Sequence, residues 1–472
     1  MACPTSLSPL PPDLFSRTYS LATGPTSIIY RTHNQAIAVL DGDSAEVWRR
    51  IFDNHGNLDA AVEYIATNGT FEGDREQEAR GVLEGFLRDL VQEHVLGERR
   101  PQTEITQFNS MRSAAVPENL EHAFKQTLAH NRVCCDLVLE LTYRCNERCR
   151  HCYLPEHRSA SELSLDEIDS LLHDFCDLGG CSVALTGGEI LTRADILDVL
   201  ALVGRSRLVP SLASNLLLLD ESTLGAMVAL CPRSVGCSIY SARPDLHDAV
   251  TRVPGSLNKS LRSIERLREA GISVVMKTPI LKATAPHWRE VEELADRLGC
   301  ALQLDLSITA RNDGKLTPLT ERVTDPAIIQ EIFSSRFYSL SYSGEQIAQM
   351  TGPCDEAGLC GAGAIGLTVG PSGEIRPCVG LNISLGNVRE NGIAEVWRNS
   401  PFLREFGAIR AKDVEVCSHC KDFAMCFRCP GAWLAEHGSY RKPTEYACFL
   451  GHALARAQRD AHEISKRKEV KP

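Results

Sequence analysis

Three cysteines, Cys145, Cys149 and Cys152, lie close together within residues 140–153. Three residues separate the first two cysteines, two separate the last two, and an apolar, strand-like run precedes them. A single loop of this length can turn three sulfurs toward one point. Three thiolates can hold three irons of a cubane iron–sulfur cluster and leave the fourth iron open to another ligand. The alternatives are a zinc knuckle or three reduced cysteines in a turn.

The chain has 472 residues and a formal net charge of -11 at pH 7, and 43% of its residues are hydrophobic. This length predicts about three domains, each with a core of its own. The charge balance, without a strongly basic run, does not indicate a nucleic-acid surface. The first residues lack a secretory pattern, and no apolar run is long enough to span a membrane. We therefore expect a cytoplasmic protein without nucleic-acid or membrane partners.

The chain contains 19 cysteines, which gather in the loop above and again within residues 354–448. Disulfide frameworks occur mostly in small secreted domains that lack a sufficient core. In a large chain without a signal peptide, clustered cysteines indicate metal binding instead. Eight further cysteines, Cys3, Cys134, Cys135, Cys176, Cys181, Cys231, Cys237 and Cys300, fall mostly within predicted helices or strands and are interpreted as small core residues.

Residues 13–96 are predicted to form a small domain of two or three strands followed by three helices. Apolar runs at 26–30 and 35–40 end in an Asp-Gly turn signal. Ser44 and Asn57 are candidate caps of the first two helices. The third helix carries apolar residues at helical spacing: Val82, Phe86, Leu87 and Leu90. Residues 97–131 are interpreted as a linker, with a helix near 119–130.

From residue 136, short apolar runs alternate regularly with amphipathic segments. Strands are predicted at 136–141, 183–186, 209–214, 234–239, 273–279 and 302–308. Helices are predicted at 164–178, 193–206, 220–229, 256–270 and 286–298, and Ser164 with Glu167 forms a capping box. This alternation predicts an α/β fold of parallel βαβ units, either a doubly wound sheet or a partial barrel. In both folds the chemistry collects at the carboxyl ends of the strands, which is where the three-cysteine loop begins.

Polar residues follow the later predicted strands. Gly187, Gly188 and Glu189 end the second, and paired glycines let a backbone approach a ligand closely while a glutamate can accept hydrogen bonds from an ammonium group. Ser214 and Asn215 end the third strand and can reach a ribose. The fourth strand ends at Ser238, and Arg252 further on can hold a carboxylate.

Together, the three-cysteine loop and Gly187-Gly188-Glu189 resemble the radical S-adenosylmethionine (SAM) enzymes, which fold as a partial, TIM-like (β/α)6 barrel. The resemblance implies that Cys145, Cys149 and Cys152 bind a [4Fe-4S] cluster whose open iron is chelated by S-adenosylmethionine. It further implies cofactor contacts from Gly187, Gly188, Glu189, Ser214, Asn215, Ser238 and Arg252, and places His151 beside the adenine. Two departures are Ile190 and Leu216, where proline and glycine are usual. In such enzymes a 5′-deoxyadenosyl radical removes a hydrogen atom from the substrate.

The C-terminal cysteines resemble the SPASM extension, a cysteine-rich domain that binds auxiliary iron–sulfur clusters. The resemblance implies one [4Fe-4S] cluster on Cys354, Cys360, Cys378 and Cys429, and a second on Cys417, Cys420, Cys426 and Cys448. With the loop cluster, three [4Fe-4S] clusters are expected. Two residues separate Cys426 from Cys429, where the family usually has three, so the ligand assignment of this pair stays open. The alternative is two zinc sites built from the Cys-x-x-Cys pairs.

The N-terminal module resembles the winged-helix-like leader-peptide recognition element of enzymes that modify ribosomally made peptides. That family binds the leader as an extra strand at the sheet edge. DNA-binding winged helices share the arrangement, but the third helix here is acidic and would face phosphates unfavourably: it carries Glu76, Glu78, Glu84 and Asp89.

These resemblances give four expected regions: a leader-recognition domain (13–96), a linker (97–131), a radical SAM barrel (132–320) and a SPASM domain (345–455). We expect an enzyme that cross-links a leader-bearing precursor peptide through a thioether or carbon–carbon bond. An electron donor such as flavodoxin or ferredoxin is expected as a partner. The alternatives are a sulfatase-maturing type that forms formylglycine, a peptide epimerase, and a non-catalytic zinc protein that binds peptides.

Overall fold

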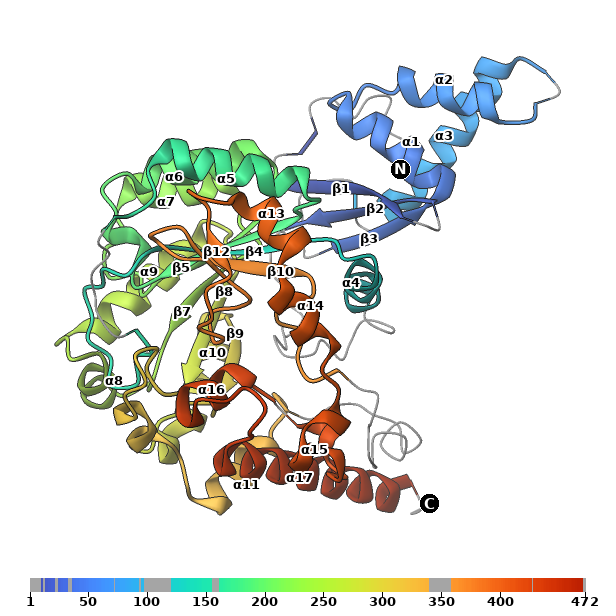
Figure 1. Cartoon of the computed structure of the whole chain (residues 1–472). Coiled ribbons are helices and arrows are strands. Elements are labelled where there is room, and N and C mark those ends of the chain that lie inside the picture. The colour runs from blue at the N-terminus through green and yellow to red at the C-terminus, as the bar shows by residue number, and fades with distance from the viewer. Residues whose placement is uncertain are drawn as a thin grey trace.

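The computed structural model describes residues 10–11, 13–21, 24–32, 36–71, 73–92, 95–96, 120–154, 161–338, 358–426 and 428–469. Two sheets organise this part of the chain (Figure 1). The first sheet contains β1 (Leu14–Leu21), β2 (Gly24–Arg31) and β3 (Ala36–Asp41), antiparallel and in that order. The second is nine-stranded, with the order β12-β11-β10-β4-β5-β6-β7-β8-β9.

Six parallel strands of the larger sheet form the barrel: β4 (Asp136–Thr142), β5 (Ser182–Gly187), β6 (Val209–Ala213), β7 (Ser234–Ser238), β8 (Val274–Pro279) and β9 (Ala301–Asp305). Each predicted strand is present within a few residues. Three C-terminal strands extend the sheet beyond β4: β10 (Gly366–Val369), β11 (Glu374–Arg376) and β12 (Gly386–Asn387). β10 runs parallel to β4, while β11 and β12 are antiparallel to their neighbours. The predicted partial (β/α)6 barrel is confirmed, and the sheet joins it to the C-terminal region.

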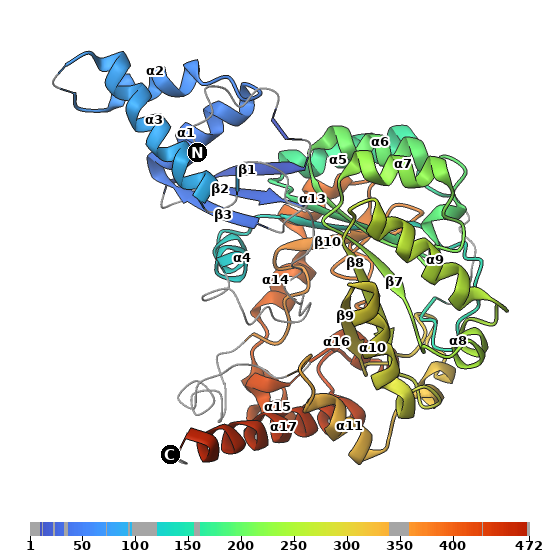
Figure 2. The same ribbon diagram turned by 180° about the vertical axis from the view of Figure 1, so that it is seen from behind.

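Helices cover the outside of the barrel (Figure 1, Figure 2): α5 (Leu165–Asp177), α6 (Ile196–Ser206), α7 (Glu221–Leu230), α8 (Pro244–Thr251), α9 (Ser256–Glu269), α10 (Trp288–Leu298) and α11 (Pro326–Phe333). Every second residue of a strand, such as Leu139, Leu185 and Cys237, points outward and packs against these helices. The predicted capping box of α5 is present: Ser164 Oγ accepts from Glu167 N, and the Glu167 carboxylate accepts from Ser164 N.

The C-terminal region continues through α13 (Gly392–Asn399), α14 (Pro401–Ala408), α15 (Glu415–Ser418), α16 (Pro430–His437) and α17 (Glu445–Glu469). Both views place α15 and α17 at the end of the molecule opposite the N-terminal domain. α17 also packs against α11 of the barrel. In the described part of the chain, none of the helices combines the length and apolar character that crossing a membrane requires.

The N-terminal sheet is covered on both faces. One face, which includes Ile29 and Leu40, packs against α1 (Gly42–Asp53), α2 (Asp59–Asn68) and α3 (Arg75–Gln92). The opposite face, which includes Ile28 and Val39, packs against α4 (Leu120–His130) and against Cys135, Cys181 and Val209, where barrel strands begin. Alternation along the strands produces these two apolar faces. The sheet is therefore docked on the barrel, at the end away from the three-cysteine loop.

Some local predictions about the N-terminal domain are wrong. Ser44 does not cap α1, because the helix already begins at Gly42 and its N-cap residue, Asp41, makes no side-chain hydrogen bond. Val82 is 53% exposed, since α3 instead turns Leu83 into the core. Asn57 does lie at the start of α2, where its side chain accepts a hydrogen bond from Asp59 N at 2.9 Å. The helix expected near 119–130 is present as α4.

Candidate active site and cysteine clusters

The three-cysteine loop leaves the carboxyl end of β4 and lies against α8. Arg148 N donates to Thr251 O at 3.0 Å, and Arg150 N donates to Val250 O at 3.2 Å. These bonds tie the loop to the last turn of α8, a helix that the sequence did not predict. Arg252 caps that helix in the left-handed conformation (φ 60°) and is exposed. The structure thus brings Arg252 beside the cysteine loop.

At the end of β5, the backbone at Gly187 and Gly188 packs directly against the backbone at the start of the cysteine loop. Gly188 N donates to Thr142 O at 2.7 Å, and Glu189 N donates to Arg144 O at 2.8 Å. A Cβ atom on Gly187 would overlap the carbonyl oxygen of Thr142, and one on Gly188 would overlap that of Arg144. Gly187 also has φ 135°, which side chains rarely allow. Only glycine at both positions permits the loop to pack this closely.

Glu189 lies at the centre of the site and is fully buried. Its carboxylate accepts hydrogen bonds from Leu191 N (2.9 Å), Ser214 Oγ (2.7 Å) and Asn215 N (2.6 Å). Burial raises the pKa of Glu189, against the effect of these hydrogen bonds. The glutamate therefore joins the ends of β5 and β6, which look like separate contacts in the sequence.

Asn215 connects this centre to the cysteine loop, because its Nδ2 donates to Asn146 Oδ1 at 2.6 Å. Ser238 ends the neighbouring strand β7 and is half-buried. The structure brings Gly187, Gly188, Glu189, Ser214 and Asn215 into one contact network. Ser238 and Arg252 approach from β7 and α8. Their contacts with a cofactor stay predictions.

His151 lies inside the loop, with its ring centroid 5.0 Å from that of Tyr240. Within the described residues, its buried Nδ1 atom has no hydrogen-bond partner. Burial lowers the pKa of His151 to about 4, so the ring is neutral at pH 7. The Tyr240 hydroxyl in turn donates to Cys149 Sγ at 3.5 Å. A neutral ring whose buried nitrogen lacks a partner among the described residues fits a site in which a bound polar heterocycle forms the missing hydrogen bond.

Glu147 is a functional candidate that the sequence analysis missed. It lies between Cys145 and Cys149, is only 4% exposed, and accepts a hydrogen bond from Cys149 Sγ at 3.3 Å. Burial raises the pKa of Glu147 to about 7. A glutamate in a polar, arginine-rich stretch looks solvent-exposed in sequence, and no pattern signals its burial.

The C-terminal cysteines separate into two groups, and the first contains Cys360, Cys378 and Cys429. Burial, together with the neighbouring Cys360 and Cys429 thiols, raises the pKa of Cys378 to about 11. Backbone amides point at all three sulfurs: Ala362 N to Cys360 (3.4 Å), Leu381 N to Cys378 (3.2 Å) and Ala432 N to Cys429 (3.4 Å). Cys354, the expected fourth member, lies outside the described residues.

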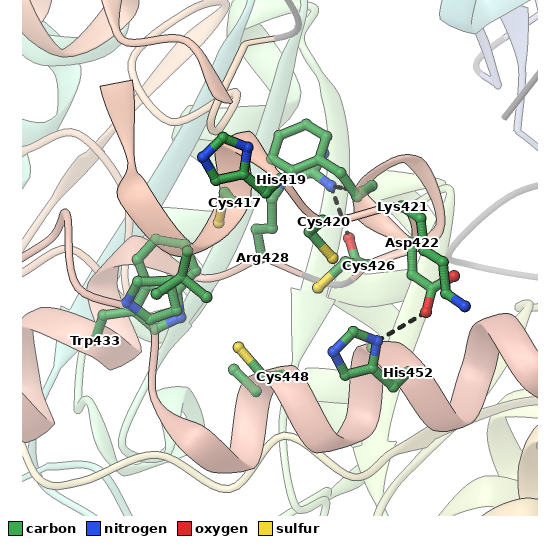
Figure 3. A pocket seen from close by; sticks show the side chains of 15 residues that line it. Cys417, His419, Cys420, Lys421, Asp422, Cys426, Arg428, Trp433, Cys448 and His452 are labelled. Carbon is green, nitrogen blue, oxygen red and sulfur yellow. Dashed lines mark hydrogen bonds and ion pairs between the residues drawn. The ribbon is translucent and has the colours of Figure 1, made fainter. Parts of the chain in front are cut away.

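The second group surrounds a cavity of about 360 Å³ (Figure 3). Cys448 on α17 lines the cavity with Cys417, Cys420 and Cys426, which come from the segment before α16. Burial raises the pKa of Cys426 to about 12, and the three other thiols of the group add to the effect. A Cβ atom on Gly451 would lie 2.6 Å from Cys426 Sγ, so α17 approaches this sulfur through a glycine.

The arrangement of these sulfurs bears on the choice of metal. Among the described residues, no three His, Cys, Asp or Glu side chains converge closely enough to bind a single metal ion. The four thiols of the second group instead line a cavity, whose wall also includes His419, Asp422 and His452. A set of thiolates around such a cavity fits an iron–sulfur cluster, which places several irons between its ligands.

The comparisons with known proteins agree with this chemistry. Residues 139–298 match the Radical SAM superfamily, and residues 360–421 match SPASM, an iron–sulfur cluster-binding domain. The AdoMet-dependent heme synthase of Oleidesulfovibrio alaskensis is 26% identical over 67% of this chain and 87% of its own length. The PqqA peptide cyclase of Rhizobium meliloti is 25% identical over 65% of this chain and 85% of its own length.

A solved structure shows the same fold over nearly the whole chain. Streptococcus suis SuiB bound to precursor peptide SuiA superposes with a TM-score of 0.59 and 15% identity. The superposition covers 93% of this chain and 99% of SuiB, so the likeness includes most of the molecule and not the barrel alone.

Gly451→Ala should weaken the second cysteine group. The added methyl group would meet Cys426 Sγ at 2.6 Å, so that either α17 or the cysteine must move. We expect the reconstituted variant to bind roughly four irons and four sulfides fewer per chain than the parent, the content of one cubane cluster. Gly407→Ala, in α14 with open space around its Cα, is the matched control and should keep the parental content. Equal iron content in both variants would contradict the close packing.

His247 should make stability depend on pH. It is fully buried, its Nδ1 accepts from Tyr240 N at 3.3 Å, and burial lowers its pKa to about 4. The unfolded chain therefore binds more protons than the folded chain below about pH 6.5, and acidification destabilises the fold. Between pH 7 and pH 5 the loss due to His247 should be about 2 kcal/mol.

In His247→Gln, stability should fall less steeply over this pH range than in the parent, as measured by urea unfolding. His130→Gln, at the exposed end of α4, is the control and should keep the parental slope. Parallel pH profiles for the parent and His247→Gln would show that the buried ring does not resist protonation.

Proposed function

Since this chain is a radical SAM enzyme with a SPASM domain, we propose that it modifies a ribosomally synthesised precursor peptide. The proposed reaction is a thioether or carbon–carbon cross-link. The observation that carries the proposal is the N-terminal three-stranded sheet docked on the barrel, with β3 at its edge. Within the described residues, no strand pairs with β3 on the side away from β2. Such an edge can bind an extended peptide by backbone hydrogen bonds.

We assign the metal ligands as three sets of cysteines. Cys145, Cys149 and Cys152 would hold the cluster that keeps one iron open. The first auxiliary cluster would use Cys354, Cys360, Cys378 and Cys429, and the second Cys417, Cys420, Cys426 and Cys448. The proximity of thiols within each described group supports this division.

S-adenosylmethionine would lie between the loop and the ends of β5, β6 and β7. The carbonyls of the Gly187–Gly188 segment and the Glu189 carboxylate would meet the methionine ammonium, and Ser238 and Arg252 the carboxylate. Ser214 and Asn215 would lie near the ribose, and His151 beside the adenine. Because three hydrogen bonds already fix the Glu189 carboxylate, it would also orient Ser214 and Asn215.

When bound, the reduced cluster and cofactor supply a 5′-deoxyadenosyl radical that removes one hydrogen atom from the substrate. Closing a cross-link releases a second hydrogen as one proton and one electron, so that the peptide loses two hydrogens in total. The electron needs an acceptor within the protein, and a cluster bound by either auxiliary cysteine group would be such an acceptor. The barrel residues hold the reacting groups in position and exclude water.

A peptide substrate is favoured over the tetrapyrrole of the heme synthases by the N-terminal domain. Relatives named for each activity are similarly distant, at 26% and 25% identity, so identity does not choose between them. A sulfatase-maturing activity would use the same clusters, but it would leave the docked sheet and its edge without a role. An electron donor such as flavodoxin or ferredoxin would reduce the clusters.

Product mass tests the reaction. The protein, reconstituted anaerobically to about twelve irons and twelve sulfides per chain, should release 5′-deoxyadenosine and remove two hydrogens from a candidate precursor peptide, localised to one residue pair. Cys149→Ala should abolish both products, because it removes a ligand of the loop cluster. An unchanged peptide mass with altered stereochemistry would favour epimerisation, and bound zinc without cofactor cleavage would overturn the enzyme.

Hydrogen exchange tests the recognition edge on the intact chain. Deleting the N-terminal domain would uncover the apolar barrel surface at Cys135, Cys181 and Val209. A loss of peptide binding in such a variant could then result from a less stable barrel and not from the missing edge strand. On addition of precursor peptide, β3 amides should become protected, whereas amides of β1 should not change. A leader with proline at alternate positions is the control, since it cannot pair as a strand. Protection confined to the barrel would overturn the assignment.

A further inference from the structure

Glu140, at the carboxyl end of β4, joins the two ends of the three-cysteine loop. Its side chain is fully buried and accepts hydrogen bonds from the hydroxyls of Tyr143 (3.0 Å) and Tyr153 (2.9 Å). Tyr143 lies two residues before Cys145, and Tyr153 directly follows Cys152. One carboxylate therefore closes the base of the loop that carries all three thiols.

The same carboxylate is paired with Arg376 of β11. Arg376 is only 3% exposed; it donates to Glu140 and also to the Tyr143 hydroxyl at 3.1 Å. β10 lies between β4 and β11 in the sheet, so the ion pair reaches across one intervening strand. Arg376 lies two residues before Cys378, a member of the first auxiliary group. The network thus connects the radical loop to the strand that leads into an auxiliary cysteine.

We propose that Glu140 and Arg376 are positioning residues that fix the three-cysteine loop relative to the Cys378 segment. The proposal rests on the cluster ligands assigned above. Neither residue would touch the substrate. The pair would instead hold the site of radical formation at a constant distance from the group that accepts the electron, so that each hydrogen abstraction leads to product.

The energetics of buried ion pairs give a way to separate this role from stability alone. Removing one partner leaves an uncompensated buried charge and is strongly destabilising, whereas replacing both by uncharged residues of similar size is often tolerated. The two tyrosine hydroxyls bond to different oxygens of Glu140. Glu140→Gln keeps one acceptor oxygen, for Tyr153, and its amide NH2 can donate to the oxygen of the Tyr143 hydroxyl. Arg376→Met fills similar space without charge. The double variant E140Q/R376M therefore keeps the loop base and loses the buried ion pair to β11, while the hydrogen bond from Tyr143 to Glu374 of β11 (3.0 Å) can persist.

A matched control is the ion pair between Arg322 and Glu436. It is also largely buried, with side-chain exposures of 11% and 8%, and it also joins the barrel to the C-terminal region. Arg322 also donates to Ile308 O at 2.8 Å and packs over the Tyr446 ring of α17. The double variant R322M/E436Q thus removes a largely buried connection in which neither partner belongs to the cysteine loop, and it leaves the neighbouring ion pair between Glu321 and Arg150 of the loop in place.

Three measurements compare the variants. The urea unfolding midpoint reports stability, and the electron paramagnetic resonance spectrum of the reduced protein, recorded before and after addition of S-adenosylmethionine, reports the cluster environment. The ratio of modified peptide to 5′-deoxyadenosine reports how often hydrogen abstraction leads to product. R376M leaves the fully buried Glu140 carboxylate without its cation and should unfold earlier than E140Q/R376M. In E140Q the Arg376 charge still has the Glu374 carboxylate nearby, so its loss of stability should be smaller. The double variant should nevertheless show an altered cofactor-dependent spectrum and a product ratio lowered by about tenfold or more, as expected for a misplaced reacting group. R322M/E436Q should keep the parental spectrum and ratio.

Arg376→Lys provides a second test if an uncharged variant does not fold. One nitrogen of Arg376, Nη2, donates to both Glu140 and the Tyr143 hydroxyl. Lysine keeps the charge on a shorter side chain and would approach both groups less closely, so its spectrum should lie between parent and double variant. A parental spectrum in both E140Q/R376M and Arg376→Lys would overturn the proposal, as would an equal change in the control. The spectrum requires no peptide, so its outcome is independent of the proposed peptide substrate.

Discussion

The site depends on the close backbone contact between the start of the cysteine loop and the Gly187–Gly188 pair. Two amides of the β5 end donate to Thr142 O and Arg144 O, and a side chain on either glycine would prevent this approach. The contact fixes where the loop begins relative to β5. Glu189 follows directly, and its three hydrogen bonds then fix the ends of β5 and β6. A cofactor would thus meet a surface already ordered by backbone geometry.

The N-terminal domain shows how strand alternation can serve two interfaces at once. Ile29 and Leu40 face the domain's own helices, while Ile28 and Val39 face α4 and the barrel. With both faces covered, the backbone edge is the part of the sheet that can add a strand. The module is also held at the barrel end opposite the loop, so a peptide bound there would have to extend along the molecule to reach the site of hydrogen abstraction.

Local signals in the sequence predicted the barrel strands, the cysteine loop and the Gly-Gly-Glu segment, because each is a short pattern of apolar spacing or fixed residue types. The sequence did not predict what depends on distant partners. Glu140 and Arg376 are far apart in the chain and become neighbours only when β10 and β11 join the sheet. Glu147 is buried by the fold around a polar stretch, and α8 lies where no helix was predicted. Similarly, Leu83 and not Val82 lies four and seven residues before the buried Leu87 and Leu90, so it shares their face of α3.

The two auxiliary cysteine groups differ in their polar surroundings. Three backbone amides donate to the sulfurs of Cys360, Cys378 and Cys429. Among the described residues, no backbone amide donates to a sulfur of the second group, which instead lines a cavity with His419 and Lys421 at its wall. Amide hydrogen bonds withdraw negative charge from thiolate sulfur and favour the reduced state of a cluster. A cluster bound by the first group would therefore be easier to reduce than one bound by the second, and the Glu140–Arg376 pair lies beside the segment that leads to the first group.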